Sequence, residues 1–185
     1  MIAVTRNLDD TPLASAALVD IAGDTGLLFR SATGGLVGIG CAAVVDADRA
    51  VTELSSIECR NESSSEDALQ PIAIGCVDFL PQASATLTIP RVTIIDNGAG
   101  DRFAIVCADK SAIDETLESV VVHPAPHPVA NSYQVDSPIS ISTYLKAVEG
   151  ARDAVRAGSL HKAVIARPVM VKAREPMSIH AVLRR

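Results

Sequence analysis

The sequence predicts a mixed fold of the α/β (α+β) class, in which β-hairpins accompany helices. Two apolar runs flank a glycine-rich turn between residues 26 and 45, and a second pair flanks the turn at 96–101. Both patterns are typical of antiparallel hairpins. Apolar side chains also recur at helical spacing between residues 140 and 157. The chain is 48% hydrophobic but only 3% aromatic, so aliphatic side chains must fill its core.

The N-terminal part of the chain contains the first predicted hairpin. Residues 1–10 show no regular pattern, so we expect a frayed start. Residues 13–21 are apolar and fit either a short helix or the beginning of a strand. Residues 26–30 predict a strand, residues 31–35 a turn, and residues 36–45 the returning strand.

Glycines in this first hairpin raise the alternative of a loop that binds phosphate. Such a loop opens a helix after a strand, whereas the residues that follow here are strand formers. Tight turning and close backbone packing are therefore the favoured roles of these glycines. They are Gly34, Gly35, Gly38 and Gly40.

The middle of the chain predicts a polar loop followed by three strands. Residues 60–67 are the most polar segment and indicate a surface loop. Residues 72–79 alternate only weakly, which indicates a strand covered on both faces. Residues 86–95 and 102–107 predict two strands joined by the Asp-Asn-Gly turn at 96–101, the firmest hairpin in the sequence.

A proline-rich connector follows the segment 114–122, which fits a helix or a strand. His123 and His127 in this connector have the i, i+4 spacing of helical metal ligands. The prolines between and beside them exclude the helix that would bring the two rings together. A metal site is therefore not predicted here.

Residues 140–157 predict the longest helix. Ser140 or Ser142 supplies its N-terminal cap, and Gly158 supplies the left-handed residue that ends it. Charged side chains occupy much of the surface opposite the apolar face. The apolar face comprises Tyr144, Leu145, Val148, Ala151 and Val155.

A single lysine marks the start of the next predicted element, a strand that begins at Lys162 and continues through residues 169–171. Burying a lysine in a strand removes water from its ammonium group, so such a residue either points outward or serves chemistry. A further helix is predicted to begin near Ser178, shortly before the sequence ends. We therefore expect the chain to be the front part of a longer protein.

The net charge of −6 disfavours nonspecific binding to nucleic acid or to anionic lipid. No apolar run is long enough to cross a bilayer, so no membrane partner is expected. Positive charge is nevertheless concentrated from residue 152 onward. This run favours a solvated face, with attraction of an anionic substrate as the alternative. Its basic residues are Arg152, Arg156, Lys162, Arg167, Lys172, Arg174, Arg184 and Arg185.

The cysteines are widely spaced, and residues 1–13 lack the apolar run of a secretory signal. A disulfide framework is not expected in a chain of this size without secretion. We therefore expect reduced, mostly buried thiols and a cytoplasmic location. The cysteines are Cys41, Cys59, Cys76 and Cys107.

Three segments resemble the chorismate-utilising enzymes of the anthranilate synthase component I-like family. Residues 144–167 are similar to the helix–strand unit of isochorismate synthases, whose strand reads G-x-x-x-K-V-V-L-A/S-R and here reads G-S-L-H-K-A-V-I-A-R from Gly158 to Arg167. Residues 29–40 resemble the N-terminal F-x-S-P…G-x-G hairpin of that family. Residues 71–90 resemble its G-x-x-x-F-d-p…L-x-I/V-P pattern, and the three segments occur in the family's order.

This resemblance implies the anthranilate synthase-like chorismate-binding fold, with antiparallel sheets and flanking helices, apparently truncated. Residues 1–130 would form the N-terminal antiparallel β-rich region. Residues 131–185 would begin the catalytic chorismate-binding region, which would be incomplete. The general-acid glutamate and the magnesium-binding glutamates of the family lie in a C-terminal half that has no counterpart here.

The resemblance also implies an activity. Isochorismate synthases use Mg²⁺ and convert chorismate to isochorismate: water adds at C2 as the 4-hydroxyl group leaves, and the lysine matched by Lys162 is the general base. A lysine acts as a base near neutral pH only where burial or neighbouring cations favour its neutral amine. We therefore expect Lys162 to be buried at the start of its strand. The product feeds siderophore (2,3-dihydroxybenzoate) or menaquinone biosynthesis.

Two alternatives stay open. A salicylate synthase carries the same lysine and adds pyruvate elimination to the same first step. A noncatalytic truncated remnant, or a binding or regulatory module with the same front half, would have no activity. Because half of the family's active site is missing, residues 1–185 are expected to be inactive alone. They are also expected to expose an apolar surface where the other half docks.

Overall fold

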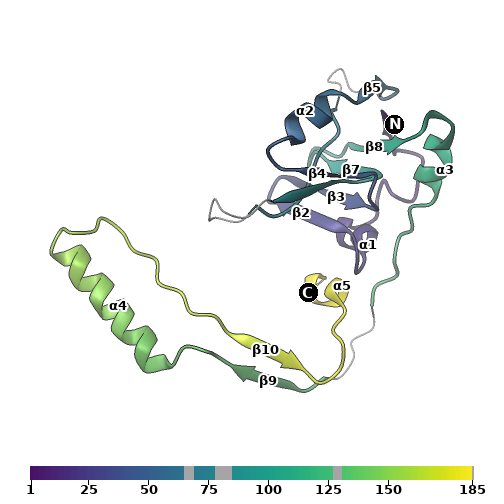
Figure 1. Cartoon of the computed structure of the whole chain (residues 1–185). Helices are drawn as coiled ribbons and strands as arrows, with labels where there is room; N and C mark the ends of the chain where they lie inside the picture. The colour runs from purple at the N-terminus through teal and green to yellow at the C-terminus, as the bar shows by residue number, and fades with distance from the viewer. Residues whose placement is uncertain (65–68, 78–84, 127–130, 185) are drawn as a thin grey trace. The chain divides into compact units, whose positions relative to one another are not determined.

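The computed structural model of the chain divides into two units (Figure 1). The first, which we call the body, comprises Met1–His127 and Ser178–Arg185. The second, which we call the insert, comprises Pro128–Met177 and interrupts the body in sequence. The residues that the structure describes are 1–64, 69–77, 85–126 and 131–184.

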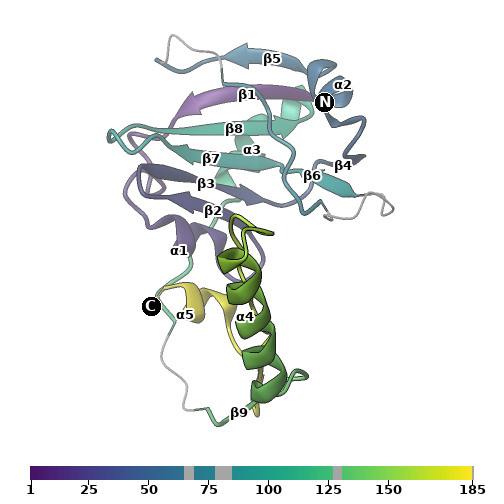
Figure 2. The same ribbon diagram turned by 90° about the vertical axis from the view of Figure 1, so that its left-hand side faces the viewer.

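A six-stranded sheet forms the centre of the body. Its strands are β1 (Ile2–Asn7), β2 (Leu27–Ser31), β3 (Gly34–Ile39), β5 (Glu58–Asn61), β7 (Val92–Asp96) and β8 (Arg102–Ala108). They lie in the order β2-β3-β7-β8-β1-β5 (Figure 2). Neighbours are antiparallel except β1 and β5, which are parallel. The predicted mixed α/β class with mainly antiparallel strands is thereby confirmed.

Both faces of the sheet are covered. The covering elements are α1 (Leu18–Ala22), β4 (Ala43–Asp46), α2 (Ala50–Ser55), β6 (Thr86–Ile89), a 3-10 turn (Lys110–Ala112) and α3 (Ile113–Glu118). α1 and α3 contribute to the apolar cluster on one face. α2 and the antiparallel pair β4–β6 contribute to the cluster on the other face. The helices therefore flank the sheet, as expected.

Alternation along the central strands fills both clusters, because successive side chains of a strand point to opposite sides. On β8, Ala104 and Val106 belong to the cluster with α1 and α3. Ile105 and Cys107 of the same strand belong to the other cluster. None of the four is more than 2% exposed, so β8 lies at the centre of the core.

Both predicted hairpins are confirmed. β2 pairs antiparallel with β3, and β7 pairs antiparallel with β8. The β7–β8 turn is held by Asp96, whose carboxylate accepts a 2.9 Å hydrogen bond from the N–H of Gly98. The glycine-rich segment of the first hairpin lies in and just after β3, with no helix directly behind it, so its interpretation as turn and packing glycines is also confirmed.

The frayed start predicted for residues 1–10 is wrong. β1 lies between β8 and β5 and pairs with β8 along its whole length. Ala3 and Val4 are 1% and 2% exposed and belong to the clusters on opposite faces. The sequence did not reveal this strand, because a short strand buried on both faces shows little alternation of apolar and polar residues. Its partner β8 is also far away in the sequence.

Two predicted strands are each divided into two. Gly40, with φ +64°, follows β3, so residues 36–45 form β3 and β4 in different sheets. Pro90 follows β6, so residues 86–95 form β6 and β7, again in different sheets. Proline cannot donate to a strand ladder, and a positive φ interrupts an extended backbone.

The strand predicted for residues 72–79 is also wrong where the structure describes it. The segment contributes a single bridge, in which Ile74 pairs with Thr88. Residues 78–79 lie outside the described residues. A segment forms a strand only where it pairs with a neighbouring strand. Here the neighbour is β6, which is four residues long.

Two other segments are now assigned. The ambiguous segment 114–122 is helical as far as Glu118, within α3. The polar segment 60–67 begins as the end of the edge strand β5, and its residues 65–67 lie outside the described ranges. The described part of that segment is exposed or half-buried, which agrees with the predicted surface position.

The insert contains a two-stranded ladder and one long helix. β9 (Tyr133–Asp136) pairs antiparallel with β10 (Met170–Ala173), and α4 (Ile141–Arg156) lies between them in sequence. Ser140 caps α4 by accepting a 3.1 Å hydrogen bond from a backbone N–H of the first turn. Gly158 follows the helix with φ +73°. The predicted helix, its cap and its terminating glycine are all confirmed.

The strand predicted to begin at Lys162 is wrong. Residues 161–169 form no regular structure, and pairing starts only at Met170. The partner strand β9 has just four residues. Beyond its end, the Ser137 hydroxyl donates a 2.7 Å hydrogen bond to the carbonyl of Pro168 and closes the ladder. The residues around Lys162 are therefore beyond the reach of the strand that could have paired with them.

The helices other than α4 are short. α5 (Ile179–Leu183) belongs to the body and contacts α1. A helix begins after Ser178, as predicted, and Ser178 caps it by accepting a 3.1 Å hydrogen bond from the N–H of Ala181. Within the described ranges, no helix combines the length and the apolar character needed to cross a bilayer.

The cysteines are free thiols, but the expectation that most are buried is wrong. Cys41, Cys59 and Cys76 are exposed, and Cys107 is buried on β8. Cys59 lies on the edge strand β5, where no further strand covers it. Burial raises the pKa of the Cys107 thiol to about 11, with a smaller effect from Cys59. Cys107 is accordingly a packing residue.

Candidate functional site

The residue singled out by the sequence, Lys162, lies in the stretch that leaves the end of α4. The backbone N–H groups of Ser159 and Leu160 both donate to the carbonyl of Ala154, and Gly158 permits this turn. Lys162 follows directly and is exposed, so the expected burial is wrong for the described residues. No ion pair joins its ammonium group to another residue in the part of the chain that the structure describes.

The stretch that carries Lys162 is nevertheless held at both ends. Its N-terminal end is fixed by the α4 terminus, where the Ser159 hydroxyl also donates to the Ala154 carbonyl at 2.8 Å. Its C-terminal end is fixed by the Ser137–Pro168 hydrogen bond and then by β10. The local fold of the insert thus presents Lys162 on an anchored segment of irregular backbone.

The ladder that closes the insert is reinforced beyond its two strands. The side-chain amide of Asn131 donates to the carbonyl of Glu175 at 3.0 Å, and its carbonyl oxygen accepts from the N–H of Glu175 at 3.2 Å. Arg174 also donates its N–H to Ser132 at 3.1 Å. These backbone-directed bonds hold the ladder without any apolar packing beneath it.

The insert has no core of its own, since none of its described residues is buried. Even Val164, two residues after Lys162, is 81% exposed. Exposed apolar side chains in such number are typical of surfaces that bind another protein, a membrane or a ligand. They are Tyr133, Val135, Ile141, Leu145, Val148, Val155, Leu160, Val164, Val169, Met170, Val171 and Met177.

Cations surround this stretch of sequence. Arg152 forms an ion pair with the adjacent Asp153 at 2.9 Å, and Arg174 lies 4.0 Å from the carboxylate of Glu175. Among the described residues, no such pair involves Lys162, Arg167 or Lys172. A run of cations in the sequence favours an anionic ligand.

No group of three or more His, Cys, Asp or Glu side chains that could hold a metal ion occurs in the described part of the chain. The side chains that the structure describes therefore do not fit a magnesium ion.

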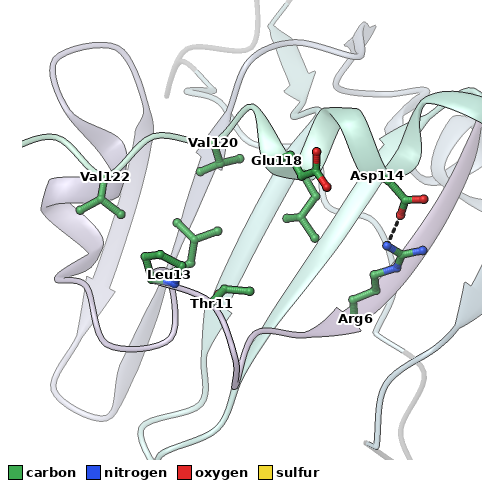
Figure 3. A pocket seen from close by; sticks show the side chains of 9 residues that line it. Arg6, Thr11, Leu13, Asp114, Glu118, Val120 and Val122 are labelled. Atoms are coloured by element: carbon green, nitrogen blue, oxygen red, sulfur yellow. Dashed lines mark hydrogen bonds and ion pairs between the residues drawn. The ribbon is translucent and has the colours of Figure 1, made fainter.

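A pocket of about 510 Å³ lies in the body, between α3 and the segment that follows β1 (Figure 3). Its walls are mainly aliphatic, with Leu13, Val120 and Val122 among them. At one end, Arg6 forms ion pairs with Asp114 and Glu62. The hydrogen bond to Asp114 is the largest of the effects that raise the pKa of Arg6. Its guanidinium group is thus already neutralised by protein carboxylates, and Lys162 is not part of this pocket.

A buried ionic cluster in the body was missed by sequence reasoning. Asp20 on α1 binds His180 at 2.8 Å, from its Oδ1 to the ring Nε2, and it also binds the guanidinium group of Arg184. Burial opposes ionisation of Asp20, but hydrogen bonds from these two partners outweigh it and lower the pKa of Asp20. A carboxylate inside the apolar run 18–22 was the available signal, because a buried charge requires a partner.

No family model, no curated protein and no solved structure matches this chain. The resemblance to chorismate-utilising enzymes therefore stays a prediction from three sequence segments, residues 29–40, 71–90 and 144–167.

Proposed function

We propose that this chain is the N-terminal part of an isochorismate synthase with the anthranilate synthase-like chorismate-binding fold. The observation that carries the proposal is the motif from Gly158 to Arg167, placed directly after a capped amphipathic helix. Chorismate is the proposed substrate, and Mg²⁺ is the proposed cofactor of the complete enzyme, with ligands outside residues 1–185.

In this proposal, Lys162 is the general base that takes a proton from the water attacking C2 of chorismate. A lysine serves as a general base only in its neutral form. Covering the apolar side chains of the insert with further polypeptide would remove water from around Lys162, and desolvation favours the neutral amine. The cations Arg167 and Lys172, which follow Lys162 in the sequence, would help to attract the dianionic substrate.

The test uses the complete reading frame that encodes this chain, assayed with chorismate and Mg²⁺. Lys162→Ala is expected to lower the rate of isochorismate formation by about 100-fold or more, the usual contribution of a general base. Lys146→Ala is the matched control, because it removes an exposed lysine of α4, in the same unit, to which the proposal gives no role. Unchanged thermal melting of both variants shows that the fold is kept. Near-normal turnover by Lys162→Ala would contradict the assigned role.

Product analysis in the same assay distinguishes an isochorismate synthase from a salicylate synthase. Isochorismate as the final product supports the proposal. Salicylate together with pyruvate would assign a salicylate synthase, which shares the first step and the lysine. The pathway that uses the product, for a siderophore or for menaquinone, follows from the genes expressed with it.

A second candidate is a noncatalytic binding module, and the pocket beside α3 favours it (Figure 3). That pocket is of the size that takes small ligands, and aliphatic side chains dominate its walls. A folded full-length product that forms neither isochorismate nor salicylate from chorismate and Mg²⁺ would favour this candidate.

A further inference from the structure

Asp20 binds more partners within the body than a carboxylate on the surface usually does. Its side chain is 13% exposed, and that of His180 is 5% exposed. The carboxylate binds the imidazole ring of His180 and both of its oxygens receive the guanidinium group of Arg184. Both partners come from α5 and its C-terminal cap, about 160 residues later in the chain.

The same residue also holds the chain on the other side of the insert. The backbone carbonyl of Asp20 accepts a 2.8 Å hydrogen bond from the N–H of His123. The rings of His123 and His180 lie edge to face, with 6.3 Å between their centroids. Thus a segment shortly before the insert and the first helix after it meet at one residue of α1.

A second carboxylate, that of Asp24, binds a different part of α5. Asp24 accepts hydrogen bonds of 2.9 Å from the Ser178 hydroxyl and from the N–H of His180, and so satisfies the first turn of α5. Asp24 therefore acts on the exposed end of the helix, whereas Asp20 binds its buried side. α5 is thus bound by Asp20 on α1 and by Asp24 shortly after α1.

We propose that Asp20 is a clamp that joins the two points at which the body chain leaves for the insert and returns from it. The clamp keeps α5 docked on α1 whatever the insert binds or how it moves. Apolar packing alone does not account for docking, because Ile179, Val182 and Leu183 on α5 are each more than half exposed. Charge pairing at a partly buried site, with Asp20 13% and His180 5% exposed, supplies the attachment instead.

Hydrogen exchange of the full chain tests the clamp through the amides of α5. Asp20→Asn keeps the size of the side chain and removes its charge. It is expected to lower the protection factors of the α5 amides by about tenfold or more. Asp10→Asn, at an exposed acid, is the matched control and should leave them unchanged. The β8 amides serve as an internal reference, since their protection shows that the body remains folded.

A second pair of variants keeps the proposal testable if Asp20→Asn disturbs α1. His180→Phe removes the partner from the α5 side and should give the same loss of protection. Insertion of Gly-Gly-Ser between Glu175 and Pro176 lengthens the connection from the insert and should leave α5 protected. The clamp is refuted if α5 keeps its protection in both Asp20→Asn and His180→Phe. It is also refuted if the Gly-Gly-Ser insertion alone releases α5.

Discussion

At the scale of single residues, neighbouring groups decide what each carboxylate does. Asp96 at the β7–β8 turn accepts a hydrogen bond from the N–H of Gly98 and pairs with Arg102 at 2.8 Å. The Gly98 hydrogen bond is the largest cause that lowers the pKa of Asp96; partial burial opposes it, and Arg102 adds to it. Asp96 therefore stabilises the folded state through its charge.

Asp96→Asn is expected to lower the free energy of unfolding by about 1–3 kcal/mol at neutral pH, the range for hydrogen bonds to charged groups. Because the folded-state pKa is lowered, the contribution of Asp96 is complete above its ordinary pKa of 3.8 and is lost as the pH falls through the folded-state value. Urea unfolding of both proteins across this range measures the effect. The difference between them should shrink on acidification, and a difference independent of pH would be evidence against the ionic role.

At the scale of elements, the two hairpins of the sheet support each other at their turns. β3 pairs with β7, so the β2–β3 turn lies beside the β7–β8 turn. Gly98 sits with φ +74°, and a methyl group there would lie 1.9 Å from the carbonyl oxygen of Thr33. The Asp-Asn-Gly sequence is thus needed for its own turn and for contact with the neighbouring one.

Gly98→Ala is expected to destabilise the protein by about 3 kcal/mol or more, from the left-handed backbone together with the steric clash. Gly100→Ala is the matched control, because its φ is +112° and no atom lies within 4 Å of the added methyl group. It should lose only about 1–2 kcal/mol, from the backbone alone. Denaturant unfolding of the two variants measures both values. Equal losses in the free energy of unfolding of the two variants would show that the clash with Thr33 does not affect stability.

At the scale of the whole molecule, stability is unevenly distributed between the two units. The body has clusters of buried side chains on both faces of its sheet, and several central residues are fully buried. The described part of the insert contains no buried residue, and α4 is held by its cap and its backbone bonds. Helices that bury no apolar face are marginal in water.

Hydrogen exchange of residues 1–185 is expected to show this contrast directly. Amides in β7 and β8 should exchange only with global unfolding, whereas amides in α4 should exchange by local opening at far lower free energy. Mass spectrometry of peptides from the two regions measures the ratio of their protection. Protection of α4 equal to that of β8 would mean that the insert is already covered, and the proposed docking surface would then have to be abandoned.

Only part of the candidate site could be predicted from the sequence. The segment carrying Lys162 was found because Gly158 and the preceding helix have local signals. The environment of Lys162 was predicted wrongly, because burial depends on what lies opposite in space. The Asp20 cluster was missed altogether, since its partner His180 lies 160 positions later.

By itself, the sequence determined the elements whose signals are local. These are the hairpin closed by its Asp-Asn-Gly turn and the helix α4 with its period, its Ser140 cap and its terminating glycine. Only the tertiary structure decided which strands are central and where they break. It placed β1 inside the sheet, between β8 and β5, and left Lys162 in unpaired backbone. The physical reason is that turns and helices are stabilised by neighbours in sequence, whereas strand pairing, burial and ion pairing depend on partners that folding brings from far away.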